Sequence, residues 1–462
     1  DAWMLQRLAH GELTLIGPTS GVPGFFLGPL WYYIGLPGYF LGGGNPIVIC
    51  LWYVAVASLA LPLFWKIGHL LFKNSSAAQL CAYALALCPG SIGRSVFIWN
   101  PLLSLPLMAT AYYGFLRARE SRKFLVLGFF AAALTLQSEF AYAVFFLPVL
   151  FILIPWLRAK FDWKDFFWSA VAIGVTLLPQ AAFEARHQFL MTKALLGSMS
   201  AMGTTVGYDY LLVHRPLSLL DATRFMLVDS LTPAFFYTLA FLLIGLIGTI
   251  LLLLRTKQSE KKFQLQLTLL LAVIPYAGYM VWRGNYGMFF DYYLTPHFIF
   301  LIPLILLGFF TLRESALASK RVPRLLANIS FLVPGILAAV FLYYVASNVF
   351  FVENMAGLKV EIEAIGILYT WREADHAPTA SFRIYTGNQL TEQYDYLSHW
   401  YADQHHLTTA PTVRHGEDNW YVLVEHNRGA GFDRWYQDAT SGGILKEQKF
   451  WGALTLEAWT KK

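Results

Sequence analysis

The chain has 462 residues, of which 57% are hydrophobic, 17% aromatic and only 13% charged, and its formal net charge is +6. This composition excludes an ordinary water-soluble globular protein, in which about a quarter of the residues are charged. Residues 1–350 hold 24 Lys/Arg and 13 Asp/Glu, whereas residues 351–462 hold ten and fifteen. The positive charge lies between hydrophobic runs rather than along one polar face, so it does not indicate nucleic-acid binding.

Hydrophobic runs recur over the first 350 residues. A helix needs about 20 mostly apolar residues to cross the roughly 30 Å hydrocarbon core of a bilayer. The sequence therefore predicts an α-helical polytopic membrane protein with about ten spans, and an eleventh upstream if the N-terminus is cytoplasmic. The predicted spans are 46–65, 77–94, 97–116, 124–138, 140–157, 166–183, 232–254, 264–282, 289–311 and 326–350.

The Lys and Arg residues between these spans predict the orientation of the chain. Seventeen of them fall in five alternate loops, while the short loops on the other side hold only Arg94 and Arg283. Cytoplasmic loops are enriched in Lys and Arg. Segments 1–45 and 184–230, together with the tail, are therefore predicted to lie on the outer side of the membrane.

The first external segment begins with a short amphipathic helix over residues 2–9 and continues as GPTSGVPGFFLGPLWYYIGLPGYF over residues 17–40. Its Gly and Pro content predicts irregular backbone rather than a spanning helix. Two interpretations stay open: a belt of aromatic rings at headgroup depth, or an irregular wall of a cavity that opens toward lipid. The candidate lipid contacts are Trp31, Tyr32 and Tyr33.

The second external segment begins with FEARHQF at residues 183–189. Ionisable groups at membrane depth are costly and so indicate function. In the functional interpretation Arg186 clamps a phosphate, and Glu184 or His187 moves a proton or holds a metal. In the structural interpretation the three form a local ion pair that caps a helix.

Further polar and aromatic residues fall at predicted outer ends of spans. One outward-facing polar site between helices would collect all of them. These candidate substrate-binding residues are Arg94, Asn100, Glu139, Arg283, Asp291, Tyr292 and Tyr293.

The tail, residues 351–462, has a different pattern. Residues 381–386, 420–425 and 452–459 are predicted as strands, and residues 391–404 as a helix that is apolar on one face. The chain is thus expected to consist of a multi-span membrane domain, residues 1–350, followed by a small external α+β domain.

Five short motifs carry a resemblance to a known family. They are LIGPTSG and GPLWYY in the first external segment, WNP at 99–101, FEARHQF at 183–189 and YYLTP at 292–296. Taken in this order, with an external domain after the last span, the sequence resembles the C-superfamily polyprenyl-phosphate-sugar glycosyltransferases. The resemblance is to the bacterial family 39 group, which is related to protein O-mannosyltransferases, and it covers essentially the whole chain with loose motifs.

The resemblance implies a sugar transfer on the outer face of a bacterial cytoplasmic membrane, from a polyprenyl-phosphate donor to a glycan, lipid or protein acceptor. It also implies an acidic general base in the first external loop, for which Asp1 is the candidate. The leaving lipid phosphate needs a cation, supplied by Arg94, Arg186 or Arg283. No cofactor is required by this chemistry, and a divalent metal is compatible with it.

A transporter or flippase of lipid-linked sugars is the alternative. Transporters often show internal repeats and helices broken near the bilayer midplane. This chain shows no convincing repeat, and its polar residues fall at outer ends of spans. A structural membrane protein with a partner-binding tail would not account for Glu184, Arg186 and Asp291. The pattern therefore favours an enzyme.

Overall fold

The computed structural model describes residues 1–96, 98–157, 162–205, 207–227, 234–282, 289–318, 357–387, 390–412, 417–429 and 431–462. The chain divides into two compact units. The first comprises Asp1, Arg7–Pro37 and Cys50–Ala339, and the second comprises Ala2–Gln6, Gly38–Ile49 and Val340–Lys462.

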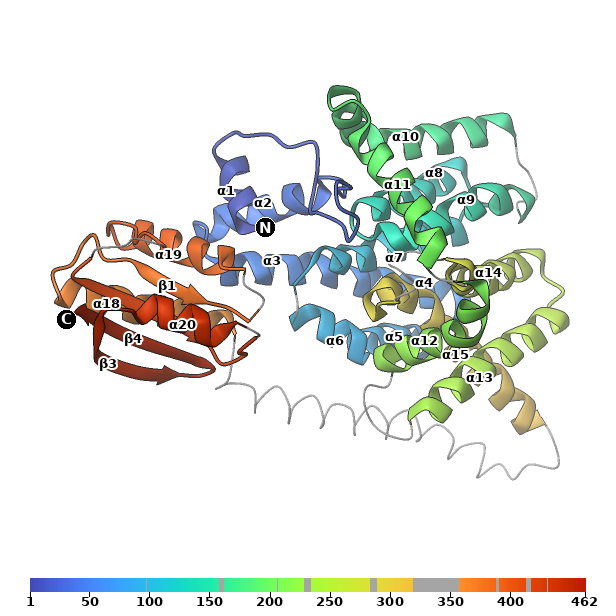
Figure 1. Ribbon diagram of the computed structural model, residues 1–462. Helices are drawn as coiled ribbons and strands as arrows, with labels where there is room; N and C mark the ends of the chain where they lie inside the picture. The colour runs from blue at the N-terminus through green and yellow to red at the C-terminus, as the bar shows by residue number, and fades with distance from the viewer. Residues whose placement is uncertain are drawn as a thin grey trace. The chain divides into compact units, whose positions relative to one another are not determined.

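Most described residues before residue 319 are helical (Figure 1). The elements are α1 (Ala2–Ala9), α2 (Leu30–Gly42), α3 (Pro46–Ser58), α4 (Ala60–Phe72), α5 (Ser75–Ala86), α6 (Pro89–Val96), η1 (Asn100–Leu103), α7 (Ser104–Leu116), α8 (Arg122–Leu134), η2 (Thr135–Gln137), α9 (Phe140–Leu157), α10 (Trp163–Arg186), α11 (Leu190–Thr205), α12 (Tyr208–Leu227), α13 (Ala234–Arg255), α14 (Ser259–Val281), η4 (Asp291–His297) and α15 (Phe298–Ala318).

Within the described residues, five helical stretches are long and apolar enough to cross a membrane. They are Pro46–Phe72, Trp163–Arg186, Thr238–Arg255, Ser259–Val281 and Asp291–Ser315. The prediction of a multi-pass membrane protein is therefore confirmed, whereas the count of ten spans is not. The predicted span 77–94 is divided at Leu87 and Cys88 into α5 and α6, and the predicted span 326–350 lies outside the described residues.

The first external segment departs from the sequence prediction. The helix predicted over residues 2–9 is confirmed as α1, but residues 30–42 form the helix α2 instead of irregular backbone. A proline inside a helix costs about 3 kcal/mol, yet α2 contains Pro37. Packing offsets this cost, because Trp31 is 1% exposed and stacks on Tyr53 with ring centroids 3.7 Å apart.

The irregular part of the segment lies before α2. Gly17 N donates to Leu27 O over 2.7 Å, and Leu27 N donates to Pro18 O over 2.9 Å, so the chain doubles back on itself. A Cβ on Gly17 would collide with the carbonyl oxygen of Gly28. Glycine at residue 17 therefore permits the two backbones to cross.

Small residues also bring membrane helices together. Helix α13 packs along α15, and a Cβ on Gly248 would meet the backbone of Gly308 at 2.5 Å. Backbones that approach this closely make extensive van der Waals contact, which drives helix association where no hydrophobic effect operates.

The second unit contains a mixed sheet with strand order β1-β2-β4-β3. β1 pairs parallel with β2 in the register Phe382↔Tyr421, and β4 pairs antiparallel with both β2 and β3. The elements are α18 (Leu358–Ala374), β1 (Phe382–Tyr385), α19 (Glu392–Gln404), β2 (Asn419–Glu425), α20 (Phe432–Thr440), β3 (Gly443–Trp451) and β4 (Leu454–Lys461). The three predicted strands and the predicted helix are all present; α18, α20 and β3 were not predicted.

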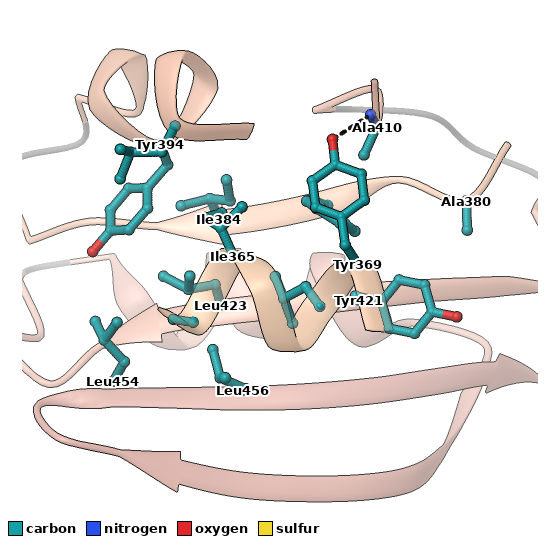
Figure 2. Close-up of a cluster of buried hydrophobic side chains, with 14 of the residues drawn as sticks. Ile365, Tyr369, Ala380, Ile384, Tyr394, Ala410, Tyr421, Leu423, Leu454 and Leu456 are labelled. Carbon is teal, nitrogen blue, oxygen red and sulfur yellow. Dashed lines mark hydrogen bonds between the residues drawn. The ribbon is translucent and has the colours of Figure 1, made fainter. Parts of the chain in front are cut away.

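Both faces of this sheet are covered over β1, β2 and β4, whereas most side chains of β3 are exposed. On one face Ile384, Leu423 and Leu456 pack with Ile365 of α18 and Tyr394 of α19 (Figure 2). On the other face Trp420, Val422 and Val424 pack with Phe432 of α20. Alternating side chains of β2 thus pack into two cores, one on each face of the sheet, which explains why β2 is buried along its length.

The second unit also holds part of the first external segment. Tyr396 Oη of α19 donates to Gly44 O over 2.7 Å, and Trp400 Nε1 donates to Gly43 O over 3.2 Å. These bonds satisfy carbonyl groups in the turn between α2 and α3, so α19 anchors that turn.

Candidate functional site

An ion pair in the first unit joins two residues that are far apart in the sequence. Arg94 on α6 places Nη2 2.6 Å from Asp291 Oδ2 at the start of η4, and their side chains are 16% and 35% exposed. A charge-assisted hydrogen bond between partly desolvated groups is strong and directional. The pair therefore fixes η4 against α6, as expected for residues that belong to one site.

Glu139 lies beside this pair, at the corner between η2 and α9. Its side chain is 4% exposed. Burial raises the pKa of its carboxyl from 4.5 to about 8, against the opposing effects of the Arg94 charge and the Ala141 backbone N–H. A carboxyl group in this state is mostly neutral at pH 7, so it is able to donate a hydrogen bond there and is poorly suited to act as a base.

The WNP motif packs onto the same corner. Asn100 is 4% exposed, and its Nδ2 donates to the carbonyl of Ser138, next to Glu139, over 2.5 Å. Its Oδ1 is buried with no hydrogen-bond partner within the described part of the chain. The Trp99 ring meets the Tyr292 ring edge-on at 4.7 Å. The motif thus ties η1 both to the Glu139 corner and to η4.

Tyrosines form the remaining wall of the site. The rings of Tyr292 and Tyr293 lie 4.6 Å apart, and Tyr279 Oη of α14 donates to the carbonyl of Tyr293 over 3.2 Å. Tyr279 was not among the residues predicted from the sequence, because it lies inside a predicted span where an aromatic residue is unremarkable.

A second arginine adjoins this wall. Arg215 of α12 is 2% exposed; its Nη2 donates to the carbonyl of Trp282 over 3.1 Å, and its guanidinium lies over the Phe289 ring at 5.4 Å. Burial lowers the pKa of Arg215, while the nearby hydroxyls of Tyr210, Tyr293 and Tyr279 oppose that change. Sequence reasoning missed Arg215, although a lone arginine within the apolar stretch LLVHRPLSLL is the signal that would have found it.

Asp1 contacts the first turn of α2. Its Oδ2 accepts a hydrogen bond from Trp31 Nε1 over 3.1 Å. The neighbouring Leu30 N donates to Gln137 Oε1 over 3.2 Å, and Gln137 precedes Glu139 by two residues. The first turn of α2 therefore contacts both Asp1 and the Glu139 corner.

The three predicted lipid contacts differ in exposure. Trp31 and Tyr32 are 1% and 6% exposed, so both are buried within the protein. Tyr33 is 40% exposed, and its hydroxyl donates to Thr14 O over 2.9 Å. Of the three, Tyr33 alone presents an exposed ring to the surroundings of the unit.

The residues of FEARHQF take part in a helix junction. Glu184 Oε1 accepts from Met191 N over 2.7 Å, and Oε2 accepts from Thr192 N over 3.0 Å, so Glu184 satisfies backbone donors in the first turn of α11. His187 stacks on Phe183 at 4.0 Å, and Arg186 is exposed. These bonds match the capping interpretation of Glu184. Arg283 lies outside the described residues.

A small apolar cavity of about 170 Å³ adjoins α6. It is lined from α3 to α7 by Val54, Ala57, Leu61, Leu85, Ser91 and Ser95, among others. Ser91 and Ser95 flank Arg94 in the sequence. An apolar cavity of about 150 Å³ holds a guest the size of benzene, so this one is large enough for a five-carbon hydrocarbon unit.

Metal-binding residues are not gathered at the site. Within the ranges that the structure describes, no three His, Cys, Asp or Glu side chains lie close enough together to hold a metal ion.

Comparison with known proteins places this arrangement in a known fold. No protein-family model matches the chain, and no curated protein matches it. A solved structure does: ArnT from Cupriavidus metallidurans in the apo state, with a TM-score of 0.57 at 10% identity, over 98% of this chain and 91% of that chain. The chain has the fold of ArnT.

A second ArnT structure from the same organism, bound to undecaprenyl phosphate, aligns with a TM-score of 0.49 at 11% identity, over 99% of this chain and 96% of that chain. At these identities the likeness concerns the fold alone.

Proposed function

We propose that this protein is a membrane glycosyltransferase that moves a sugar from a polyprenyl-phosphate donor to an acceptor hydroxyl on the outer face of the cytoplasmic membrane. The observation that carries the proposal is the Arg94–Asp291 pair beside the buried, largely neutral Glu139. The positive charge of Arg94 and the neutral carboxyl of Glu139 both suit a phosphate group, and the one carboxylate beside them, Asp291, is already paired with Arg94. The motif resemblance and the ArnT fold support the same reaction.

In the proposed reaction the acceptor oxygen attacks the anomeric carbon and forms the new glycosidic bond. The bond between that carbon and the phosphate oxygen breaks, and the polyprenyl phosphate departs with the electron pair. The hydroxyl proton passes to the carboxylate of Asp1, which is assigned this role from the family resemblance. Its contact with Trp31, one residue from the Leu30–Gln137 bond, supports the assignment.

Cations are proposed to stabilise the leaving phosphate. Arg94 is engaged by Asp291 through Nη2, and a guanidinium has further N–H groups with which to bind a phosphate oxygen. Arg215 supplies a second positive charge beside Tyr293. Donors aimed at a developing negative charge are typically worth about 10²–10³ in rate each.

The carrier lipid accounts for the apolar surroundings. ArnT, whose fold this chain has, has been solved with undecaprenyl phosphate bound. In this chain the cavity beside α6 is proposed to take an isoprene unit near the phosphate, with Ser91 and Ser95 on the turns around Arg94. A lipid-linked donor would thus place its charged and hydrocarbon parts on the same short helix.

Substitution of the two arginines tests these roles. Arg94→Ala and Arg215→Ala are each expected to lower kcat/KM for a polyprenyl-phosphate sugar by about 10²-fold. Arg255→Ala is the matched control, since Arg255 is an exposed residue at the end of α13 that bonds Ser315 Oγ over 2.7 Å. Equal rates in all three variants and the wild type, at equal protein levels, would remove the phosphate-binding assignment.

A further inference from the structure

A buried polar pair joins α9 to η4, the helix that begins at Asp291. Tyr142 and His297 are both fully buried, and Tyr142 Oη lies 3.0 Å from His297 Nδ1. Their surroundings are aromatic: Phe300 lies beside His297, and the Tyr276 ring meets His297 edge-on at 4.7 Å. Polar groups are costly in such surroundings unless they are hydrogen-bonded, so the bond between them strongly constrains both side chains.

Each partner belongs to a segment that carries one acidic residue of the site. Tyr142 follows Glu139 by three residues in the first turn of α9, a rise of roughly 4.5 Å. His297 ends η4 and follows Asp291 by six residues, roughly 12 Å along a 3₁₀ helix. The bond thus links the Glu139 corner to the segment that bears Asp291.

The η4 segment depends on contacts from outside itself. It is a 3₁₀ helix of seven residues with Pro296 inside, and 3₁₀ helices longer than three or four residues are uncommon because their hydrogen-bond geometry is poor. At its middle the Tyr293 carbonyl accepts a bond from Tyr279, and at its end His297 bonds Tyr142. Together with the Arg94–Asp291 pair at its start, these contacts hold η4 in position.

We propose that the Tyr142–His297 hydrogen bond is a positioning contact that sets the placement of the Asp291 end of η4 relative to Glu139. Arg94, which bonds Asp291 and whose charge acts on Glu139, is then held in a fixed place relative to both carboxyl groups. The inference rests on the proposed function for its catalytic consequence. A misplacement of about 1 Å in such a site costs on the order of 10²-fold in rate.

The environment of Glu139 provides a readout that a purely structural role would not move. The charge of Arg94 on α6 acts on the Glu139 carboxyl, and that carboxyl in turn acts on the hydroxyls of Tyr279 of α14 and of Tyr292 and Tyr293 of η4. All four lie on η4 or contact it, since Arg94 bonds Asp291 and Tyr279 bonds the Tyr293 carbonyl. If the contact positions η4, loosening it admits water to Glu139 and brings the pKa of that carboxyl back toward its ordinary value.

The test compares Tyr142→Phe with the double variant Tyr142→Phe/His297→Leu. The single variant leaves a buried ring nitrogen without its bond, whereas the double variant removes both polar partners and should regain much of the thermal stability. We expect transfer to stay at least about tenfold below wild type in both variants. Wild-type thermal stability should stop falling near pH 8, the folded-state pKa of Glu139. We expect this levelling-off pH to move down by about one pH unit in both variants.

Tyr112→Phe is the matched control. Tyr112 is also fully buried, and its hydroxyl makes a comparable bond to Thr268 Oγ1 over 2.6 Å between α7 and α14. The Tyr112→Phe variant should lose stability without a change in the pH at which thermal stability levels off. The proposal is overturned if the double variant regains transfer together with stability. It is also overturned if the pH at which thermal stability levels off is the same in Tyr142→Phe as in the wild type.

The two proposals fail separately. If the wild-type protein transfers no sugar from any polyprenyl-phosphate donor, the proposed function fails. The pH dependence of thermal unfolding, followed from pH 6 to pH 9.5 in detergent, still decides whether Tyr142 and His297 control the Glu139 environment.

Discussion

Substitution of Glu139 by glutamine gives a sharp prediction for the site. The carboxyl is buried, and its pKa is raised from 4.5 to about 8. At pH 7 the neutral form therefore exceeds the ionised form by about tenfold, and the full shift corresponds to roughly 5 kcal/mol. Because glutamine has nearly the same shape and also donates a hydrogen bond, Glu139→Gln should keep transfer at pH 7 within about threefold of wild type.

The two proteins should separate as the pH rises. The folded-state pKa of Glu139 lies above its unfolded value, so its contribution to stability is fully present below about pH 4.5 and is lost as the pH rises through about 8. Wild-type thermal stability should fall from pH 6 and level off above about pH 8, and wild-type transfer should decline as the carboxyl ionises near pH 8. The variant should show neither change. The assay is the initial rate of sugar transfer from pH 6 to pH 9.5, with unfolding temperatures from the same samples.

One result would refute this reasoning about Glu139. If Glu139→Gln is folded but loses more than about 100-fold in transfer at pH 7, the residue acts through its charge. Glu139 would then act as a base, and its carboxyl would be ionised at pH 7 despite its burial. Glu120→Gln serves as the control, because that carboxylate is an exposed partner of Arg117 in a predicted cytoplasmic loop.

Three other predictions concern the surrounding structure. Glu184→Ala should lower stability by about 1 kcal/mol through loss of the α11 cap, with KM for the donor unchanged; a donor KM raised tenfold would instead place Glu184 in the substrate site. Gly17→Ala should reduce the yield of folded protein, because the new Cβ would collide with the Gly28 carbonyl. Gly93→Ala should not, because the space around its Cβ position is open. Equal yields of the two variants on size-exclusion chromatography would count against the backbone crossing. Partial burial raises the pKa of Asp375, but hydrogen bonds from Lys446 and Tyr421 and the Lys446 charge outweigh it and lower that pKa. The stability that Asp375 contributes is therefore present above about pH 4 and is lost as the pH falls through the folded-state pKa. Asp375→Asn should therefore speed amide exchange in β2 at pH 7 by a factor that corresponds to about 1 kcal/mol, and an unchanged exchange rate would deny the pair a stabilising role.

The sequence predicted the elements whose residues alternate or repeat strongly. Residues 382–385 and 419–425 alternate between two cores, and each was predicted as a strand. β3, with the sequence GILKEQKFW, was missed because most of its side chains are exposed, so no apolar periodicity marks it. Propensity also failed for α2, where the stacking of Trp31 on Tyr53 outweighs a helix-breaking Pro37.

The site was predictable as a set of positions but not as a geometry. Charge counting placed Arg94, Glu139 and Asp291 at the same side of the membrane, and the structure brings these three together. Which partner each would take depends on tertiary packing over 197 residues, and no local pattern contains that information. Arg215 escaped for the same reason, since its role arises from the rings and carbonyl that surround it.

The most direct test of the central claim is a mass-spectrometric transfer assay. Purified protein in lipid nanodiscs would be incubated with a panel of undecaprenyl-phosphate sugars and an extract of envelope glycans, lipids and proteins. We expect one donor to lose its sugar, free undecaprenyl phosphate to appear in equal amount, and an acceptor to gain the mass of that sugar, all abolished or strongly reduced by Arg94→Ala. Intact donors with every sugar, or movement of intact donors across a sealed bilayer without any gain of mass in an acceptor, would contradict a glycosyltransferase and favour a transporter of lipid-linked sugars.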